Sequence, residues 1–171
     1  MRIKFELNGS TAEVEVEPWE SLFDVLRGKF GIKSVKTALC ENSCSACGAC
    51  TVLMDGRPIY SVMTPAYRAN GHRITTLEGL STKGHLDPLQ EAFLEAGAVQ
   101  CGFCTSGMIL SAKAFLEGGG SPDEREIKEA IRGNLCRCTG YVKIVDAIRM
   151  AALRAGKEGK EVDVGPCPPW S

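Results

Sequence analysis

The first stretch of the chain alternates apolar and polar residues. Apolar side chains occupy every second position on both sides of Asn8-Gly9, namely Ile3, Phe5, Leu7, Ala12, Val14 and Val16. A period of two interrupted by Asn-Gly predicts a β-hairpin. Pro18 then precedes residues 19–30, whose apolar positions follow helical spacing up to Gly31, so we expect a helix packed on the hairpin.

Strand-like patterns continue to about residue 78. Residues 51–54 and 58–62 flank the turn Asp55-Gly56 and predict a second hairpin, and residues 73–76 add a short strand. The first part of the chain is therefore expected to form a small mixed sheet with one packed helix.

From residue 86 onward the apolar positions recur at helical spacing. Helices are expected near residues 89–96 and 104–117, then from the start signal Ser121-Pro122-Asp123-Glu124 to Gly133, and around residues 144–151. The remaining residues are rich in Gly, Pro and charge and have no period, which is typical of a surface or partner-bound tail. We expect an α+β fold with three parts, residues 1–78, 79–155 and 156–171.

Composition narrows the class of function. The 171 residues include 20 basic and 21 acidic side chains. A net charge of −1 does not indicate the excess of positive charge that nucleic-acid binding usually requires. No apolar run approaches the roughly 20 residues of a membrane span. The first residues show no export signal, so we expect a cytoplasmic chain. In that reducing compartment, nine cysteines favour metal ligation or redox work over disulfides.

Eight of the nine cysteines form two sets of four. The first set is Cys40, Cys44, Cys47 and Cys50, and the second set is Cys101, Cys104, Cys136 and Cys138. Four thiolates converging on one point suit an iron–sulfur cluster, and small neighbours such as Gly48 and Gly102 allow the backbone to approach its sulfurs. On spacing alone, structural zinc sites are the alternative. Cys167 is interpreted as an incidental free thiol.

The second set has a favourable predicted setting. Cys101 and Cys104 fall at the start of the helix expected near 104–117, where the helix dipole favours an anionic centre. Cys136 and Cys138 follow the third expected helix. Two helices lying side by side would each bring two thiolates together, as a four-helix bundle allows.

A longer motif surrounds the second set. The segments QCGFCTSGM, from Gln100, and GNLCRCTGY, from Gly133, resemble the signature of the two-cluster iron–sulfur subunits of the xanthine dehydrogenase family. With CGACTV at Cys47 and further matches, this resemblance extends to about residue 152. The chain is similar in the same way to the small subunits of carbon monoxide dehydrogenase, aldehyde oxidoreductase and 4-hydroxybenzoyl-CoA reductase. This resemblance argues against structural zinc sites at the two cysteine sets.

The resemblance implies an N-terminal plant-ferredoxin-like β-grasp domain and a C-terminal four-helix bundle, each carrying one 2Fe-2S cluster. It also implies a large partner subunit with a molybdopterin cofactor, approached by Gln100 and Cys138, and a medium subunit with FAD. The implied function is electron relay from molybdenum toward FAD within an oxidoreductase complex. A free-standing ferredoxin-like carrier is the alternative.

The first set departs from the family pattern, which is C-x4-C-x2-C with a fourth cysteine about a dozen residues later. Asn42 and Val62 stand where two of those ligands are expected, whereas Cys40 and Cys44 are additional. The compact spacing favours a 4Fe-4S cluster slightly over a rearranged 2Fe-2S cluster. In the competing interpretation, Cys40 or Cys44 is not a ligand and the first cluster is degenerate or absent. Ser106, where the family usually has proline, is expected to affect only the helix start.

A substrate site is not visible in the sequence. His72 and His85 stand apart from both cysteine sets and are interpreted as surface or loop residues. The glycines at 118–120 lack the lysine of a phosphate-binding loop. We therefore expect this chain to conduct electrons while its partner carries out the substrate chemistry.

Overall fold

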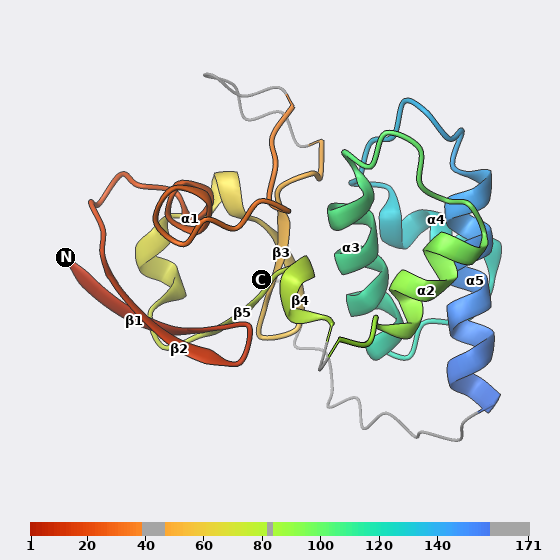
Figure 1. Cartoon of the computed structure of the whole chain (residues 1–171), viewed down its shortest axis with the longest axis horizontal. Helices are drawn as coiled ribbons and strands as arrows, with labels where there is room; N and C mark the ends of the chain where they lie inside the picture. Colours follow the sequence, from red (N-terminus) through yellow and green to blue (C-terminus); the bar gives the residue numbers. More distant parts are fainter. Residues whose placement is uncertain (39–46, 82–83, 158–171) are drawn as a thin grey trace.

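The computed structural model describes residues 1–38, 47–81 and 84–157. Cys40, Cys44, Cys167 and the predicted tail from residue 158 lie outside these ranges. A sheet half formed by the first part of the chain lies beside a helical half formed by the second part (Figure 1). The predicted change from strands to helices is therefore confirmed.

The first hairpin forms as its alternation predicts. Strand β1 (Arg2–Leu7) pairs antiparallel with β2 (Ser10–Glu15). Ile3, Phe5 and Leu7 are buried, whereas the residues between them are exposed. Asn8 and Gly9 adopt φ angles of 51° and 83°, the left-handed conformations that a tight hairpin turn of this twist requires.

The helix expected over residues 19–30 is shorter and partly wider than predicted. It begins after Ser21, whose hydroxyl accepts a hydrogen bond from the Asp24 amide while the Asp24 carboxylate accepts one from the Ser21 amide. One turn of α-helix, α1 (Leu22–Asp24), passes into a π-helix, η1 (Val25–Lys29). This path buries Leu22, Val25 and Leu26 against the sheet, and π-helical turns of this kind are uncommon.

Three more strands complete the sheet that the described residues form. Strands β3 (Thr51–Met54) and β4 (Arg57–Tyr60) make the second hairpin, and β5 (Arg73–Thr75) is the short strand. The strand order is β2-β1-β5-β3-β4, with β1 and β5 parallel and the other neighbours antiparallel. Two short 3-10 turns, η2 (Ser61–Met63) and η3 (Ala66–Ala69), lie between β4 and β5, and a third, η4 (Leu77–Gly79), follows β5.

The helical half contains α2 (Pro88–Glu95), α3 (Thr105–Glu117), α4 (Glu124–Ile131) and α5 (Val142–Lys157). Helix α2 begins at a capping box made by Asp87 and Gln90. The start predicted for α4 is wrong by two residues, because Asp123 rather than Ser121 is the N-cap. The Asp123 carboxylate accepts hydrogen bonds from the amides of Arg125 and Glu126.

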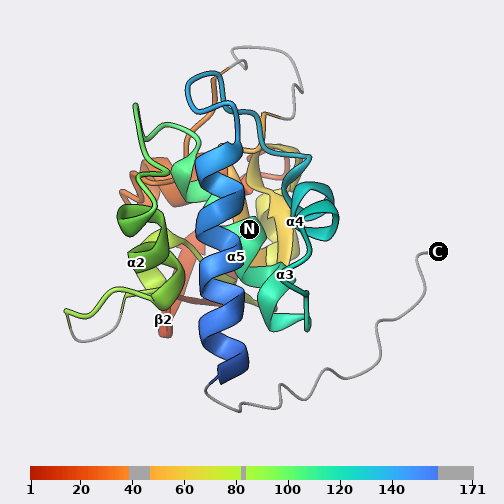
Figure 2. The same ribbon diagram turned by 90° about the vertical axis from the view of Figure 1, so that its right-hand side faces the viewer.

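Each half has its own buried apolar cluster. The cluster of the helical half is centred on Phe93, Met108 and Ile148, where α5 packs against α2 and α4, and α3 packs against α4. Figure 2 shows α5 at the front of this half with α2 and α4 on its two sides. Helix α3 faces strands β3 and β4 and so forms the junction with the sheet half. Among the described residues, no helix is long and apolar enough to cross a membrane.

Candidate iron–sulfur site

The second cysteine set comes together from two loops of the helical half. Cys101 and Cys104 lie in the turn before α3, and Cys104 is the N-cap of this helix, as predicted. Cys136 and Cys138 lie in the loop between α4 and α5. The Sγ atoms of Cys138 and Cys101 are 3.5 Å apart, and the thiols of Cys104 and Cys136 share a hydrogen bond. The fold thus joins thiols that are more than 30 positions apart in the chain.

The thiols are arranged as two pairs. Two thiolates on one tetrahedral metal with bonds of about 2.3 Å would lie roughly 3.8 Å apart, close to the 3.5 Å between Cys101 and Cys138. Within the described ranges, no three His, Cys, Asp or Glu side chains gather in a way that would hold one metal ion. A 2Fe-2S cluster takes four thiolates, two on each iron. The paired arrangement therefore suits a binuclear cluster better than a single zinc ion.

The four thiols have different pKa values. The backbone amide of Phe103, followed by the thiol of Cys138, lowers the pKa of Cys101. Burial raises the pKa of Cys104 to about 12. Burial also opposes ionisation of Cys136, but hydrogen bonds from the hydroxyl and amide of Thr139 outweigh it and lower the pKa. The thiol of Cys101 raises the pKa of Cys138. Cluster binding must therefore drive deprotonation most strongly at Cys104.

Tyr141 braces the loop that carries Cys136. Its hydroxyl accepts a hydrogen bond of 2.8 Å from the Cys136 amide and donates one of 3.2 Å to the carbonyl oxygen of Asn134. The Thr139 hydroxyl donates to Cys136 Sγ at 3.1 Å and accepts from the Tyr141 amide at 3.1 Å. Tyr141 itself has a φ of 69°, an unusual conformation for a bulky side chain. These contacts fix the direction of the Cys136 thiol.

The first cysteine set is described in part. Cys47 and Cys50 are 7% and 5% exposed and lie in the loop that enters β3, whereas Cys40 and Cys44 lie outside the described residues. The carbonyl oxygen of Cys50 accepts hydrogen bonds from the amide and hydroxyl of Ser61. Position 62 is therefore close to Cys50, but its valine packs against the apolar cluster of the sheet half.

The two cysteine loops are joined by hydrogen bonds. The Leu135 amide donates to the carbonyl oxygen of Cys47 at 2.9 Å, and the side-chain amide of Asn134 donates to the carbonyl oxygen of Gly48 at 3.0 Å. The Tyr60 hydroxyl donates to the carbonyl oxygen of Gly133 at 3.1 Å. Burial, followed by the thiols of Cys50 and Cys47, raises the pKa of this tyrosine. Backbone on both sides of the junction is thereby fixed beside the cysteines.

Two glycines allow this close approach. A β-carbon at Gly107, on α3, would lie 2.0 Å from the carbonyl oxygen of Gly48, far inside contact distance. A β-carbon at Gly48 would lie 2.4 Å from the side-chain nitrogen of Asn134, and Gly48 also has a φ of +76°. Only glycine fits both positions without moving the two loops apart.

Ser106 has a larger role than the predicted one. The residue is 2% exposed, and its hydroxyl donates to the carbonyl oxygen of Ser34 at 2.7 Å and accepts from Lys36 Nζ at 3.4 Å. The expectation that this departure from proline affects only the helix start is therefore wrong. Proline offers neither a hydroxyl donor nor a hydroxyl acceptor, so it would remove both contacts across the junction.

The outer side of the second set is open. Gln100, Cys101 and Cys138 are exposed. Large apolar side chains in the same loops and at the start of α5 are exposed as well, namely Val99, Phe103, Leu135 and Val142. Such a group of apolar side chains around polar residues is typical of a surface that another protein covers.

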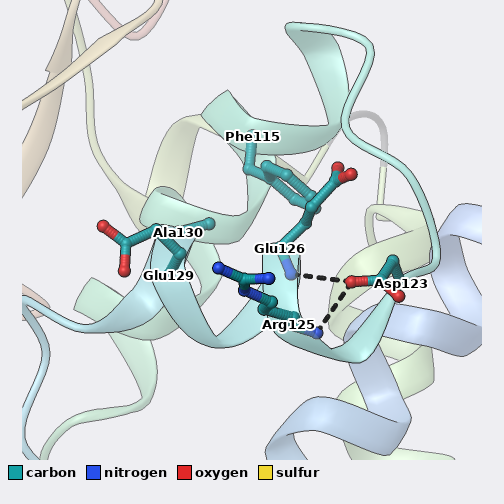
Figure 3. A pocket seen from close by; sticks show the side chains of 6 residues that line it. All are labelled: Phe115, Asp123, Arg125, Glu126, Glu129 and Ala130. Atoms are coloured by element: carbon teal, nitrogen blue, oxygen red, sulfur yellow. Dashed lines mark hydrogen bonds between the residues drawn. The ribbon is translucent and has the colours of Figure 1, made fainter.

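Other polar groups of the molecule are engaged in local structure. Figure 3 shows an open hollow on α3 and α4 near Phe115, where the Asp123 carboxylate is directed at backbone amides of its own helix. None of the described cysteines lines this hollow. His72 is exposed and its Nδ1 lies 2.6 Å from Asp55 Oδ2. None of these features resembles a substrate site.

Sequence patterns did not reveal the roles of several residues at the junction. Asn134 is 3% exposed and Lys36 is half-buried, although their residue types are usually exposed. An asparagine between Gly133 and Leu135, directly before a cysteine pair, was the available signal for the first. Lys36 was not recognisable from the sequence, because its ammonium group contacts Ser106, 70 positions away, and the ring of Phe103.

Comparison with known proteins supports the same site. Residues 76–149 match the 2Fe-2S binding domain family. The chain is 48% identical over 152 residues to the nicotinate dehydrogenase small FeS subunit of Eubacterium barkeri, covering 89% of this chain and 95% of that protein. It is 42% identical to the xanthine dehydrogenase iron-sulfur-binding subunit of Escherichia coli O157:H7, covering 85% and 91%. The crystal structure of quinoline 2-oxidoreductase from Pseudomonas putida 86 contains a similar chain, with a TM-score of 0.85, 43% identity and coverage of 93% and 97%.

Proposed function

Because the chain belongs to the family of iron–sulfur small subunits of xanthine and nicotinate dehydrogenases, we propose that it relays electrons within a molybdenum-dependent oxidoreductase complex. The observation that carries this proposal is the junction of the two cysteine sets. The Leu135 amide, one residue before Cys136, donates to the carbonyl oxygen of Cys47. A short covalent path with one hydrogen bond thus connects a thiol of each set.

We assign a 2Fe-2S cluster to Cys101, Cys104, Cys136 and Cys138. A bound cluster supplies a one-electron acceptor. The chain's own residues hold the four thiolates, orient Cys136 through Thr139 and Tyr141, and bury Cys104 away from water. Family membership and the paired thiols both support this assignment.

We assign a second iron–sulfur cluster to Cys40, Cys44, Cys47 and Cys50. The buried positions of Cys47 and Cys50 and the valine at position 62 support a ligand set drawn from this single loop. The preference for 4Fe-4S rests on the spacing of the cysteines alone, and the matched family is of the 2Fe-2S type. The number of iron atoms at this set is therefore the quantity to measure.

The open side of the second set is the proposed contact with the large subunit. Gln100 and Cys138 are exposed beside apolar side chains, which fits their assignment as the residues that approach a molybdopterin cofactor. The first set then passes electrons outward to FAD on a medium subunit. We place this complex in the cytoplasm, where thiols remain reduced for iron ligation.

The domain scheme belongs to the same proposal. Residues 1–78 form a β-grasp domain, which the order β2-β1-β5-β3-β4 with its parallel β1–β5 pair supports. Residues 79–155 form a four-helix bundle, supported by their separate apolar cluster. Residues 156–171 form the tail. A free-standing electron carrier is the alternative function. It is not favoured, because the similar proteins are subunits of larger enzymes.

Purification of the chain from its native source tests this function. We expect it to elute with a larger polypeptide containing molybdenum. Anaerobic mixing of that complex with N-heterocycles such as nicotinate, xanthine and quinoline, followed by freezing and EPR, should show reduced iron–sulfur signals within one turnover. A chain that elutes alone and accepts electrons from unrelated reductases would instead support the free carrier.

A further inference from the structure

Lys36 connects the two cysteine loops through its backbone and its side chain. Its amide donates a hydrogen bond of 3.1 Å to the carbonyl oxygen of Ala49, between Cys47 and Cys50. Its ammonium group donates to the Ser106 hydroxyl at 3.4 Å and lies 5.7 Å from the centre of the Phe103 ring. The residue is thus fixed on the loop of the first set while its charge lies at the second set.

The charges that act on the ammonium group come from both halves of the described chain. Lys36 is half-buried, and burial is the largest influence on its pKa, which it lowers. Glu78 attracts the ammonium and Arg27 repels it, and Cys104 and Cys101 attract it as well. Electrostatic interactions are stronger in such a partly desolvated place than in water. The charge therefore acts on the thiols of the second set as well as on Glu78.

The surroundings hold this charge in place. Ser106 also donates to the carbonyl oxygen of Ser34, and the Ser34 amide and hydroxyl donate to the Glu78 carboxylate at 3.0 and 2.6 Å. Thr76 adds a hydrogen bond of 2.7 Å to Glu78. Lys36 and Glu78 thus belong to one network, with opposite charges at fixed positions.

We propose that Lys36 is a positioning residue that raises the reduction potential of the centre held by Cys101, Cys104, Cys136 and Cys138 relative to the first centre. This inference rests on the proposed function. One electron enters from a reductant, no bond forms or breaks, and the negative charge of the thiolate-bound centre grows by one. A nearby cation stabilises the more negative form, so its removal lowers the potential.

Potentiometric EPR titration of the intact complex tests this role in Lys36→Met, Lys36→Arg, Lys33→Met and Glu78→Gln. We expect Lys36→Met to shift the second-set signal to a more negative potential, by about tenfold in equilibrium constant or about 59 mV for one electron. The first-set signal should shift less. Lys36→Arg should remain close to wild type, and Lys33→Met should not shift, since Lys33 is an exposed lysine of the same segment.

Glu78→Gln separates electrostatics from damage to the fold. It removes a negative charge from the same network, so the second-set signal should move to a more positive potential. Equal potentials for wild type and Lys36→Met, or negative shifts for both Lys36→Met and Glu78→Gln, would overturn the inference while leaving the relay intact. If Lys36→Met loses its cluster, the direction in which Glu78→Gln shifts the second-set potential decides whether charge in this network sets that potential. Absence of iron–sulfur signals from wild type would instead refute the proposed function.

Discussion

The amide nitrogen of Leu135 lies 2.9 Å from the carbonyl oxygen of Cys47, so neighbouring backbone of the two cysteine sets is hydrogen-bonded directly. Asn134 reinforces this bond from the adjacent position, and Gly48 and Gly107 provide the necessary space. The junction is therefore both the contact that unites the halves and the proposed route for electrons. Mutations there should affect stability and electron transfer together.

Asn134→Ala should destabilise the metal-free chain by about 1–3 kcal/mol, because buried polar contacts are lost. Its side chain donates to Gly48 and accepts a hydrogen bond of 2.8 Å from the Ser111 hydroxyl, which would lose this partner. Denaturant unfolding measures the change. Asn70→Ala is the matched control, since Asn70 accepts an exposed hydrogen bond from the Lys4 amide. Equal losses for the two variants would contradict a special role for Asn134.

Gly107→Ala should destabilise the chain by roughly 3 kcal/mol, because the added methyl group would overlap the Gly48 carbonyl oxygen. Tightly packed sites relax little around an added group, so the strain remains in the folded state. Gly28→Ala is the control: it lies in a helical segment, and nothing lies within 4 Å of the added carbon. The control should be neutral or stabilising by about 0.4–1 kcal/mol. Thermal unfolding of both variants checks the difference, and a neutral Gly107→Ala would show that the loops can separate freely.

Sequence patterns predicted the elements of the fold better than their junction. The alternation around Asn8-Gly9 and the helical spacing after residue 86 identified strands and helices because both signals are local. The π-helical turn at Val25–Lys29 was missed because its buried positions, Leu22, Val25 and Leu26, have the same spacing as in a regular α-helix. The second cysteine set was recognisable by its motif. The contacts of Lys36, Ser106 and Asn134 were not, since each depends on residues brought close only by folding.

The Glu78 carboxylate should make the folded chain less stable in acid than at neutral pH. Burial alone would raise its pKa, but hydrogen bonds from Ser34 and Thr76 outweigh burial and lower it from the ordinary value of 4.5. A lowered pKa in the folded state means that the contribution is complete above 4.5 and disappears as the pH falls through the folded value. Unfolding free energies between pH 7 and pH 3 should therefore fall less steeply for Glu78→Gln than for wild type. Glu6→Gln controls for loss of one exposed charge, and identical slopes for wild type and Glu78→Gln would contradict this account.

Cys136→Ser should remove the 2Fe-2S cluster of the helical half and stop turnover of the complex, because a serine hydroxyl is a poor replacement for a thiolate. Substrate binding by the large subunit should not weaken. Steady-state assays and ligand titration of the purified complex measure the two effects. Cys167→Ser, in the tail, should match wild type in both. Normal turnover of Cys136→Ser would remove this thiol from the relay.

The most direct test is to count iron and acid-labile sulfide in the purified chain and to record EPR spectra after reduction with dithionite. The account predicts two distinct iron–sulfur signals, one of them of the 2Fe-2S type and lost in Cys136→Ser. Six iron atoms per chain would indicate a 4Fe-4S cluster at the first set, and four would indicate two 2Fe-2S clusters. A colourless protein without iron or sulfide would contradict the account.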